Sequence, residues 1–96
     1  MSAMAETALR ITIAGRVQGV GFRAWACAEA GRLEIRGWVR NRRDGTIEAL
    51  LIAPREHVEA MIAACRRGPA LARVSEIARE EARDDGTSGF HERPTV

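Results

Sequence analysis

A nine-residue segment rich in glycine, Gly15–Arg23, holds the first residues whose types and spacing suggest chemistry. Gly15, Gly19 and Gly21 allow the backbone to turn so that successive N–H groups point into one concavity, and such a nest binds anions. Arg23 follows at once, where its planar guanidinium can bind two oxygens of the same anion. A flexible connection with a solvated arginine explains the pattern equally well, because glycine loops before helices are common.

A second polar segment, Gly37–Gly45, ends in the pair Asp44-Gly45. This pair favours a tight hairpin turn because both residues tolerate positive φ. Asn41 precedes the turn, where its side chain can bond to nearby backbone groups. Its amide can also donate and accept hydrogen bonds to hold a water molecule. The residues alone leave both interpretations of Asn41 open.

Two familiar nucleotide motifs are excluded. Gly19-x-Gly21-x-x-Ala24 formally matches the dinucleotide fingerprint, but that fold needs a parallel sheet and a longer chain. A P-loop needs lysine, and all 15 basic residues here are arginine. The histidines stand alone and the two cysteines are far apart, so we expect neither a metal nor a cofactor.

The positioning elements follow from periodicity and from turn signals. Apolar residues alternate over residues 9–13, as in a half-buried strand, and an alanine-rich helix is predicted over 22–32. The remaining predicted elements are strands over 35–41 and 46–53, a helix that begins at Pro54 and ends at Gly68-Pro69, a fourth strand around 74–77, and a short edge strand near Phe90. The order β-α-β-β-α-β predicts an α+β, ferredoxin-like sandwich with two helices on one face of a mostly antiparallel sheet.

Length and composition are those of one small globular domain. The chain has 96 residues, of which 46% are hydrophobic and 29% charged, and its net charge of +2 does not demand nucleic acid. No apolar run reaches the roughly 18 residues of a membrane span, and the N-terminus does not resemble a signal peptide. We expect a flexible segment over 1–8, a single domain over 9–95, a cytoplasmic location and a monomer.

Taken together, the two polar segments resemble the acylphosphatase family. The family pattern G-x-V-Q-G-V-x-F-R is matched by Gly15–Arg23. The companion pattern G-W-V-R-N-x-x-D-G-x-V is matched by Gly37–Ile47, with isoleucine in place of the last valine. Residues 65–69 and 72–74 also look like the family, and the resemblance covers roughly residues 9–95. One departure is Glu34, which stands where many relatives have glycine.

The resemblance implies hydrolysis of acyl phosphates, that is, of carboxyl–phosphate anhydrides, to a carboxylate and inorganic phosphate without a metal. By similarity, Arg23 and Asn41 are the catalytic residues, with Asn41 orienting the attacking water. The implied phosphate-binding backbone amides are those of Gln18, Gly19, Val20, Gly21, Phe22 and Arg23. The implied partners are a small acyl phosphate and its phosphate product, with no nucleic acid and no membrane.

Two binding functions remain as alternatives. A non-catalytic module that binds phosphate or carbamoyl phosphate would use the same glycine-rich segment, but it has no need of an amide that orients water. An RNA-recognition domain shares the order of elements, and Arg36-Gly37-Trp38 begins like its aromatic motif. Arg40 then replaces the next aromatic residue, and the chain has few aromatic side chains on which bases could stack.

Overall fold

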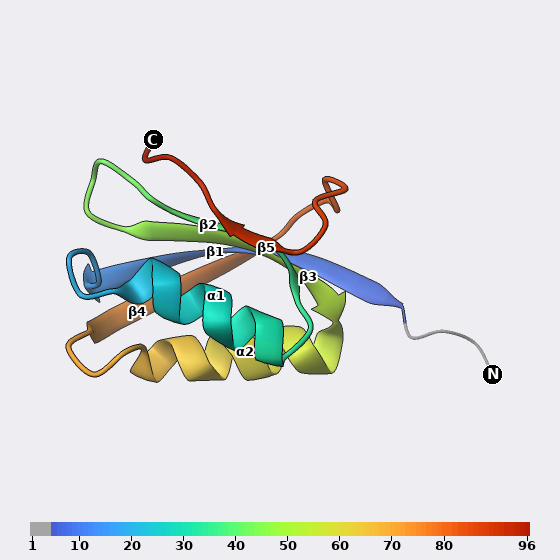
Figure 1. The fold of residues 1–96 in the computed structure, drawn as a ribbon, viewed down its shortest axis with the longest axis horizontal. Helices are drawn as coiled ribbons and strands as arrows, with labels where there is room; N and C mark the ends of the chain where they lie inside the picture. The colour runs from blue at the N-terminus through green and yellow to red at the C-terminus, as the bar shows by residue number, and fades with distance from the viewer. Residues whose placement is uncertain (1–4) are drawn as a thin grey trace.

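Alternating apolar side chains give the sheet one face that must be covered, and both helices lie on that face (Figure 1). The computed structural model describes residues 5–96. Its elements are β1 (Glu6–Arg16), α1 (Phe22–Arg32), β2 (Arg36–Asn41), β3 (Ile47–Pro54), α2 (Arg55–Arg67), β4 (Arg73–Glu81) and β5 (Phe90–Glu92). The predicted order of elements and the short edge strand are therefore confirmed.

The N-terminal boundary differs from the expectation. β1 begins at Glu6, so residues 6–8, expected in the flexible segment 1–8, belong to the sheet. The pairing explains the difference, because Ala8 lies opposite Ile52 of β3 and its carbonyl accepts a hydrogen bond from the N–H of Ala82. Residues 1–4 lie outside the described part of the chain.

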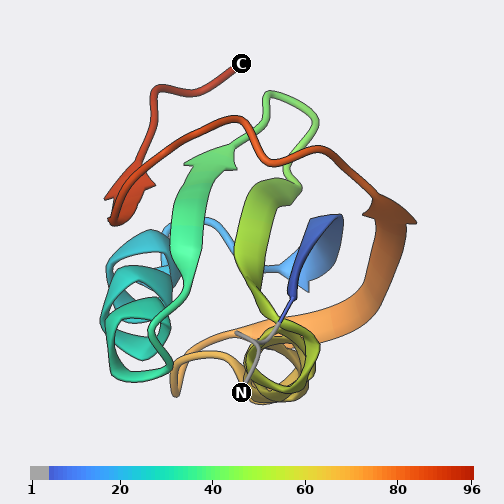
Figure 2. The ribbon, with the colours of Figure 1, turned by 90° about the vertical axis from the view of Figure 1, so that its right-hand side faces the viewer.

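The five strands form one sheet in the order β4-β1-β3-β2-β5. The pairs β1–β3, β1–β4 and β2–β3 are antiparallel, and β5 pairs in parallel with β2. The segment between β4 and β5 crosses from one edge strand to the other on the side away from the helices (Figure 2). The sheet is thus the mostly antiparallel, ferredoxin-like one that the sequence predicts.

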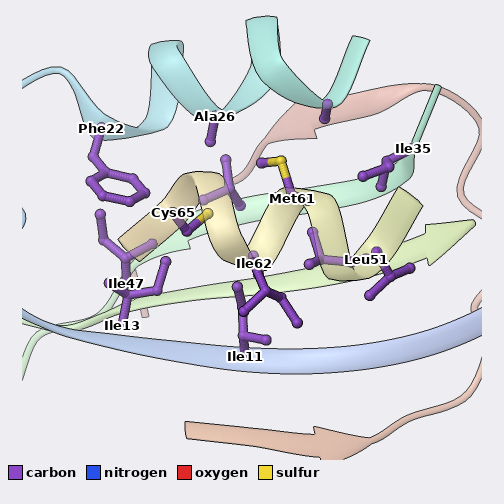
Figure 3. Packing of buried hydrophobic residues seen from close by; sticks show 14 of the residues in the cluster. Ile11, Ile13, Phe22, Ala26, Ile35, Ile47, Leu51, Met61, Ile62 and Cys65 are labelled. Atoms are coloured by element: carbon purple, nitrogen blue, oxygen red, sulfur yellow. The ribbon is translucent and has the colours of Figure 1, made fainter. Parts of the chain in front are cut away.

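The main core lies between the helices and one face of the sheet (Figure 3). Ile11 and Ile13 of β1 point into it, and one face of α2 is buried there. The buried residues of that face include Val58, Met61, Ile62 and Cys65. Trp25 of α1 is half-buried and packs edge-on against Phe22 with the ring centroids 5.3 Å apart.

A second, smaller apolar cluster lies on the opposite face. It contains Trp38, Leu50 and Ile52, so the central strand β3 is buried on both sides. The segment after β4 covers this cluster, and the indole N–H of Trp38 donates to the Asp85 carboxylate at 3.0 Å. The pKa of Asp85 is lowered to about 2, mainly by hydrogen bonds from the side chain and the backbone of Thr87. The hydrogen bond from Trp38 makes a smaller contribution in the same direction. The carboxylate is therefore ionised and holds the segment against the sheet.

The contact between β2 and β3 depends on Gly37. Its φ is 136°, a region that side chains rarely adopt, and a Cβ there would lie 1.9 Å from the carbonyl oxygen of Leu50. Any larger residue would have to push the two strands apart. β2 carries Asn41 at its end, so this close approach also fixes where that side chain lies.

We therefore expect Gly37→Ala to lower the free energy of unfolding by about 2 to 4 kcal/mol, from overpacking and backbone strain together. Gly31→Ala is the matched control, since an added Cβ on the exposed face of α1 meets nothing within 4 Å. That change should leave stability unchanged or raise it by about 0.5 kcal/mol. Urea unfolding of the three proteins measures the difference, and equal stabilities for Gly37→Ala and the parent would contradict this account of the β2–β3 contact.

Candidate active site

The two polar segments meet at one edge of the sheet. β1 and β2 both run antiparallel to β3, which lies between them, so they point in the same direction and their carboxyl ends share an edge. Ile47 of β3 marks this edge, because it lies opposite Ile13 of β1 on one side and Asn41 of β2 on the other. The glycine-rich loop after β1 and the β2–β3 hairpin therefore lie at the same end of the sheet (Figure 1).

The loop between β1 and α1 forms a cradle of backbone N–H groups, defined here as residues 18–24. Gly19 and Gly21 adopt left-handed conformations with φ of 74° and 79°, which turn successive amides to one side. Within residues 5–96, the N–H groups of the cradle donate to no acceptor, and the first helical bond runs from Trp25 N–H to the Gly21 carbonyl at 3.0 Å. Free donors at the positive end of a helix are the arrangement that suits the binding of an anion.

The cradle opens into a cavity of about 160 Å³. Its lining residues are Val17, Gln18, Gly19, Gly21, Phe22, Arg23, Ala24, Asn41 and Glu92. Arg23 and Asn41, separated by most of a helix and a strand in the sequence, thus face one cavity. Of the residues predicted to supply amides, only Val20 does not line it, and its side chain packs partly buried against the core.

Gln18 joins the cradle to the β2–β3 hairpin. Its side-chain amide donates to the carbonyl of Arg42 at 2.8 Å and to that of Thr46 at 2.9 Å. Both of its N–H donors are used in this way, so the side chain fixes the distance between the cradle and the end of β2. The sequence identifies Gln18 only as a source of a backbone N–H, and its structural role depends on partners 24 and 28 residues away.

Asn41 keeps its side chain free for a ligand. Its carboxamide makes no hydrogen bond to residues 5–96, whereas its backbone carbonyl accepts one from the N–H of Val96 at 3.2 Å. The hairpin behind it is closed by Asp44, which accepts bonds from the Thr46 N–H at 2.9 Å and the Thr46 hydroxyl at 2.6 Å. These bonds lower the pKa of Asp44. A fixed strand end with an unused amide is suited to holding a polar molecule in the cavity.

Glu92 is the charged residue of the cavity that the sequence did not identify. It is the last residue of β5, and its carboxylate Oε1 lies 3.7 Å from Nη1 of Arg23. It reaches the cavity because β5 pairs with β2, with Glu92 opposite Val39. A three-residue edge strand carries too little periodicity to reveal such pairing in advance.

Other reactive side chains take no part in the cavity. Burial raises the pKa of Cys65 to about 12, and burial, followed by the charge of Glu92, raises that of Cys27. Both thiols therefore stay protonated near neutral pH, which makes them poor nucleophiles. In the part of the chain that the structure describes, no group of three or more His, Cys, Asp or Glu side chains could hold a metal ion.

Comparison with known proteins agrees with this geometry. The acylphosphatase family model matches residues 9–92. The acylphosphatase of Rhizorhabdus wittichii is 48% identical over 89 residues, which cover 93% of this chain and 90% of that protein. The acylphosphatase of Acidiphilium cryptum is 49% identical over 88 residues, which cover 92% of this chain and 97% of that protein.

Solved structures give the same result at the level of the fold. The crystal structure of acylphosphatase from Bacillus subtilis superimposes with a TM-score of 0.87 at 34% identity, covering 93% of this chain and 99% of that one. Sequence, fold and family model agree over nearly the whole chain, and the chain therefore belongs to the acylphosphatase family.

Proposed function

We propose that this chain hydrolyses acyl phosphates with the phosphoryl group held by the cradle and Arg23 and the water oriented by Asn41. The activity itself follows from membership of the family. The observation that supports the roles of the residues is the shared cavity, in which free backbone donors, one guanidinium and one free carboxamide face each other. A module that only binds phosphate is not favoured, because relatives that match over most of their length are acylphosphatases.

The cradle suits phosphoryl transfer for an electrostatic reason. In the transition state negative charge is spread over three equatorial oxygens, and the main task of the protein is to position and stabilise that charge. Backbone N–H groups fixed by a loop and a helix need no reorganisation when the charge develops. Arg23, in the first turn of α1, adds a planar fork that can bind two of these oxygens.

The bond changes need no further catalytic group. The oxygen of water forms a bond to phosphorus while the bond between phosphorus and the acyl oxygen breaks. The electron pair stays on the departing carboxylate, a stable anion that needs no general acid. An amide is not a base, so the proton of the water goes to an oxygen of the phosphoryl group itself. Asn41 contributes orientation, which lowers the entropic part of the barrier.

No metal is required in this scheme, since the cradle and Arg23 supply the positive field that a cation supplies elsewhere. We further propose that residues 6–96 form a single domain, which begins with β1 at Glu6 and acts as a monomer in the cytoplasm. Both cysteines are free thiols, as expected in a reducing compartment. Across residues 5–96, no helix is long and apolar enough to cross a membrane.

The direct test is hydrolysis of benzoyl phosphate by the purified chain in excess chelator, followed by the loss of its ultraviolet absorbance. We expect full activity under these conditions, because no step uses a metal. Loss of activity in chelator that returns on addition of magnesium or zinc would overturn the mechanism. No hydrolysis with or without metals would instead support the binding module.

Arg23→Lys should lower kcat/KM by about a hundredfold or more, since an ammonium keeps the charge but loses the bidentate fork. Arg32→Lys is the matched control, because Arg32 lies in the last turn of the same helix and, among residues 5–96, pairs only with Glu29. Benzoyl phosphate kinetics should leave the control near the parental rate. Parental kcat/KM in Arg23→Lys would show that Arg23 does not bind the phosphoryl group.

Asn41→Ala should separate binding from chemistry. Phosphate that binds only the folded protein stabilises it by about 2.7 kcal/mol at a hundredfold excess over Kd. This protection should persist in Asn41→Ala while turnover is lost, because the cradle is untouched. In Arg23→Ala both should be lost. The measurement is thermal unfolding of the three proteins with and without millimolar phosphate, paired with kinetics.

If Asn41→Ala loses protection as fully as Arg23→Ala does, Asn41 is a phosphate ligand or a support for the cradle. If it keeps full activity, Asn41 is only a residue of the strand end. Either result would contradict its role in orienting water.

A further inference from the structure

Glu92 places a negative charge inside a cavity that is otherwise built for an anion. Its Oε1 lies 3.7 Å from Nη1 of Arg23, and the side chains are 47% and 38% exposed, respectively. Both groups are therefore held close together and are still open to solvent. Within residues 5–96 this is the only ion pair of either side chain, so the guanidinium of Arg23 has no other acidic partner.

The position of Glu92 is set by the sheet and not by the ion pair. β5 lies beside β2 in parallel, with Glu92 opposite Val39, and the next N–H, that of Arg93, donates to the Val39 carbonyl at 2.9 Å. The carboxylate is thus held near the cradle whether or not Arg23 is engaged. Glu92 also places an acidic group near the start of α1, although the first turn of this helix contains no acidic residue.

Two electrostatic effects of this carboxylate oppose phosphate. It pairs with the guanidinium that phosphate needs, and it repels a second anion placed in the same cavity. The charge of Glu92 also acts on Cys27, which lies one turn further along α1. Burial raises the pKa of this thiol most, and the Glu92 charge raises it further. A phosphate in the cradle must therefore displace the carboxylate from Arg23 or share the guanidinium with it.

We propose that Glu92 competes internally for Arg23 and thereby sets how weakly the site holds phosphate. The inference rests on the proposed function, in which inorganic phosphate is the product and leaves from the cradle. A cradle of fixed donors with one unopposed guanidinium would hold this product strongly and remain occupied by it. The carboxylate of Glu92 offsets part of that attraction, so that phosphate leaves and the next substrate enters.

The test is Glu92→Gln, which keeps the size of the side chain and removes its charge. We expect the inhibition constant for phosphate and the KM for benzoyl phosphate to fall together by about two- to fivefold, the range typical of an exposed ion pair. The difference from the parent should shrink at about 1 M salt, where exposed charges are screened. Competitive inhibition by inorganic phosphate at low and high salt measures both effects.

Glu34→Gln is the matched control. It removes the same charge just beyond the far end of α1, a helix of 11 residues. Its side chain is exposed and makes no ion pair within residues 5–96. The distance along the helix is about 16 Å, beyond the Debye length at physiological salt. Its inhibition constant and KM should match those of the parent.

Two outcomes would overturn the proposal. Unchanged constants in Glu92→Gln would show that the carboxylate does not influence the site. A rise in both constants would show that it instead positions Arg23 for binding. The rise in melting temperature of each protein with phosphate gives a second value of the affinity that does not depend on turnover. If the parent chain proves unable to hydrolyse benzoyl phosphate, the proposed function fails, whereas these phosphate affinities still decide the role of Glu92.

Discussion

The position of β3 between β1 and β2 is the constraint on which the site depends. Because both neighbours are antiparallel to β3, they are parallel to each other, and their carboxyl ends lie at one edge. The cradle follows the first of these ends and Asn41 stands at the second. Gln18 then fixes the separation by donating to the carbonyls of Arg42 and Thr46. The geometry of the proposed site is thus a property of the strand order and of one side chain that bridges two loops.

The proposed site costs stability because backbone N–H groups in it lack hydrogen-bond acceptors within the described chain. The N–H groups of the cradle have no partner within residues 5–96, and the start of α1 has no capping side chain. An anion bound there would supply the missing acceptors and complete a hydrogen-bonding pattern that the fold leaves open. Under the proposed function, these preorganised donors would stabilise both the transition state and the phosphate product. A nearby carboxylate that moderates this attraction is consistent with a site that must release phosphate.

The segment that follows β4 connects the face of the sheet opposite the helices to the proposed site. It covers Trp38 through the bond to Asp85, and Arg93 lies over the indole ring with its guanidinium carbon 5.5 Å from the centroid. From there β5 carries Glu92 into the cavity, and the N–H of Val96 binds the carbonyl of Asn41. The end of the chain therefore both buries the outer face of β2 and contributes to the surroundings of each proposed catalytic residue.

The sequence by itself determined the order of elements, the apolar face of β1, the glycine-rich segment before α1, and Arg23 and Asn41 as candidate residues. These features are local, because periodicity, turn chemistry and motif spacing act over a few neighbouring residues. Only the tertiary structure decided that β1 begins at Glu6, that Trp38 belongs to a second cluster, that Gln18 ties two loops together and that Glu92 faces Arg23. Each of these depends on strand pairing or on contacts between residues far apart in the chain. Such contacts leave no periodic signal in one sequence, because they are fixed by how the elements pack and not by which elements form.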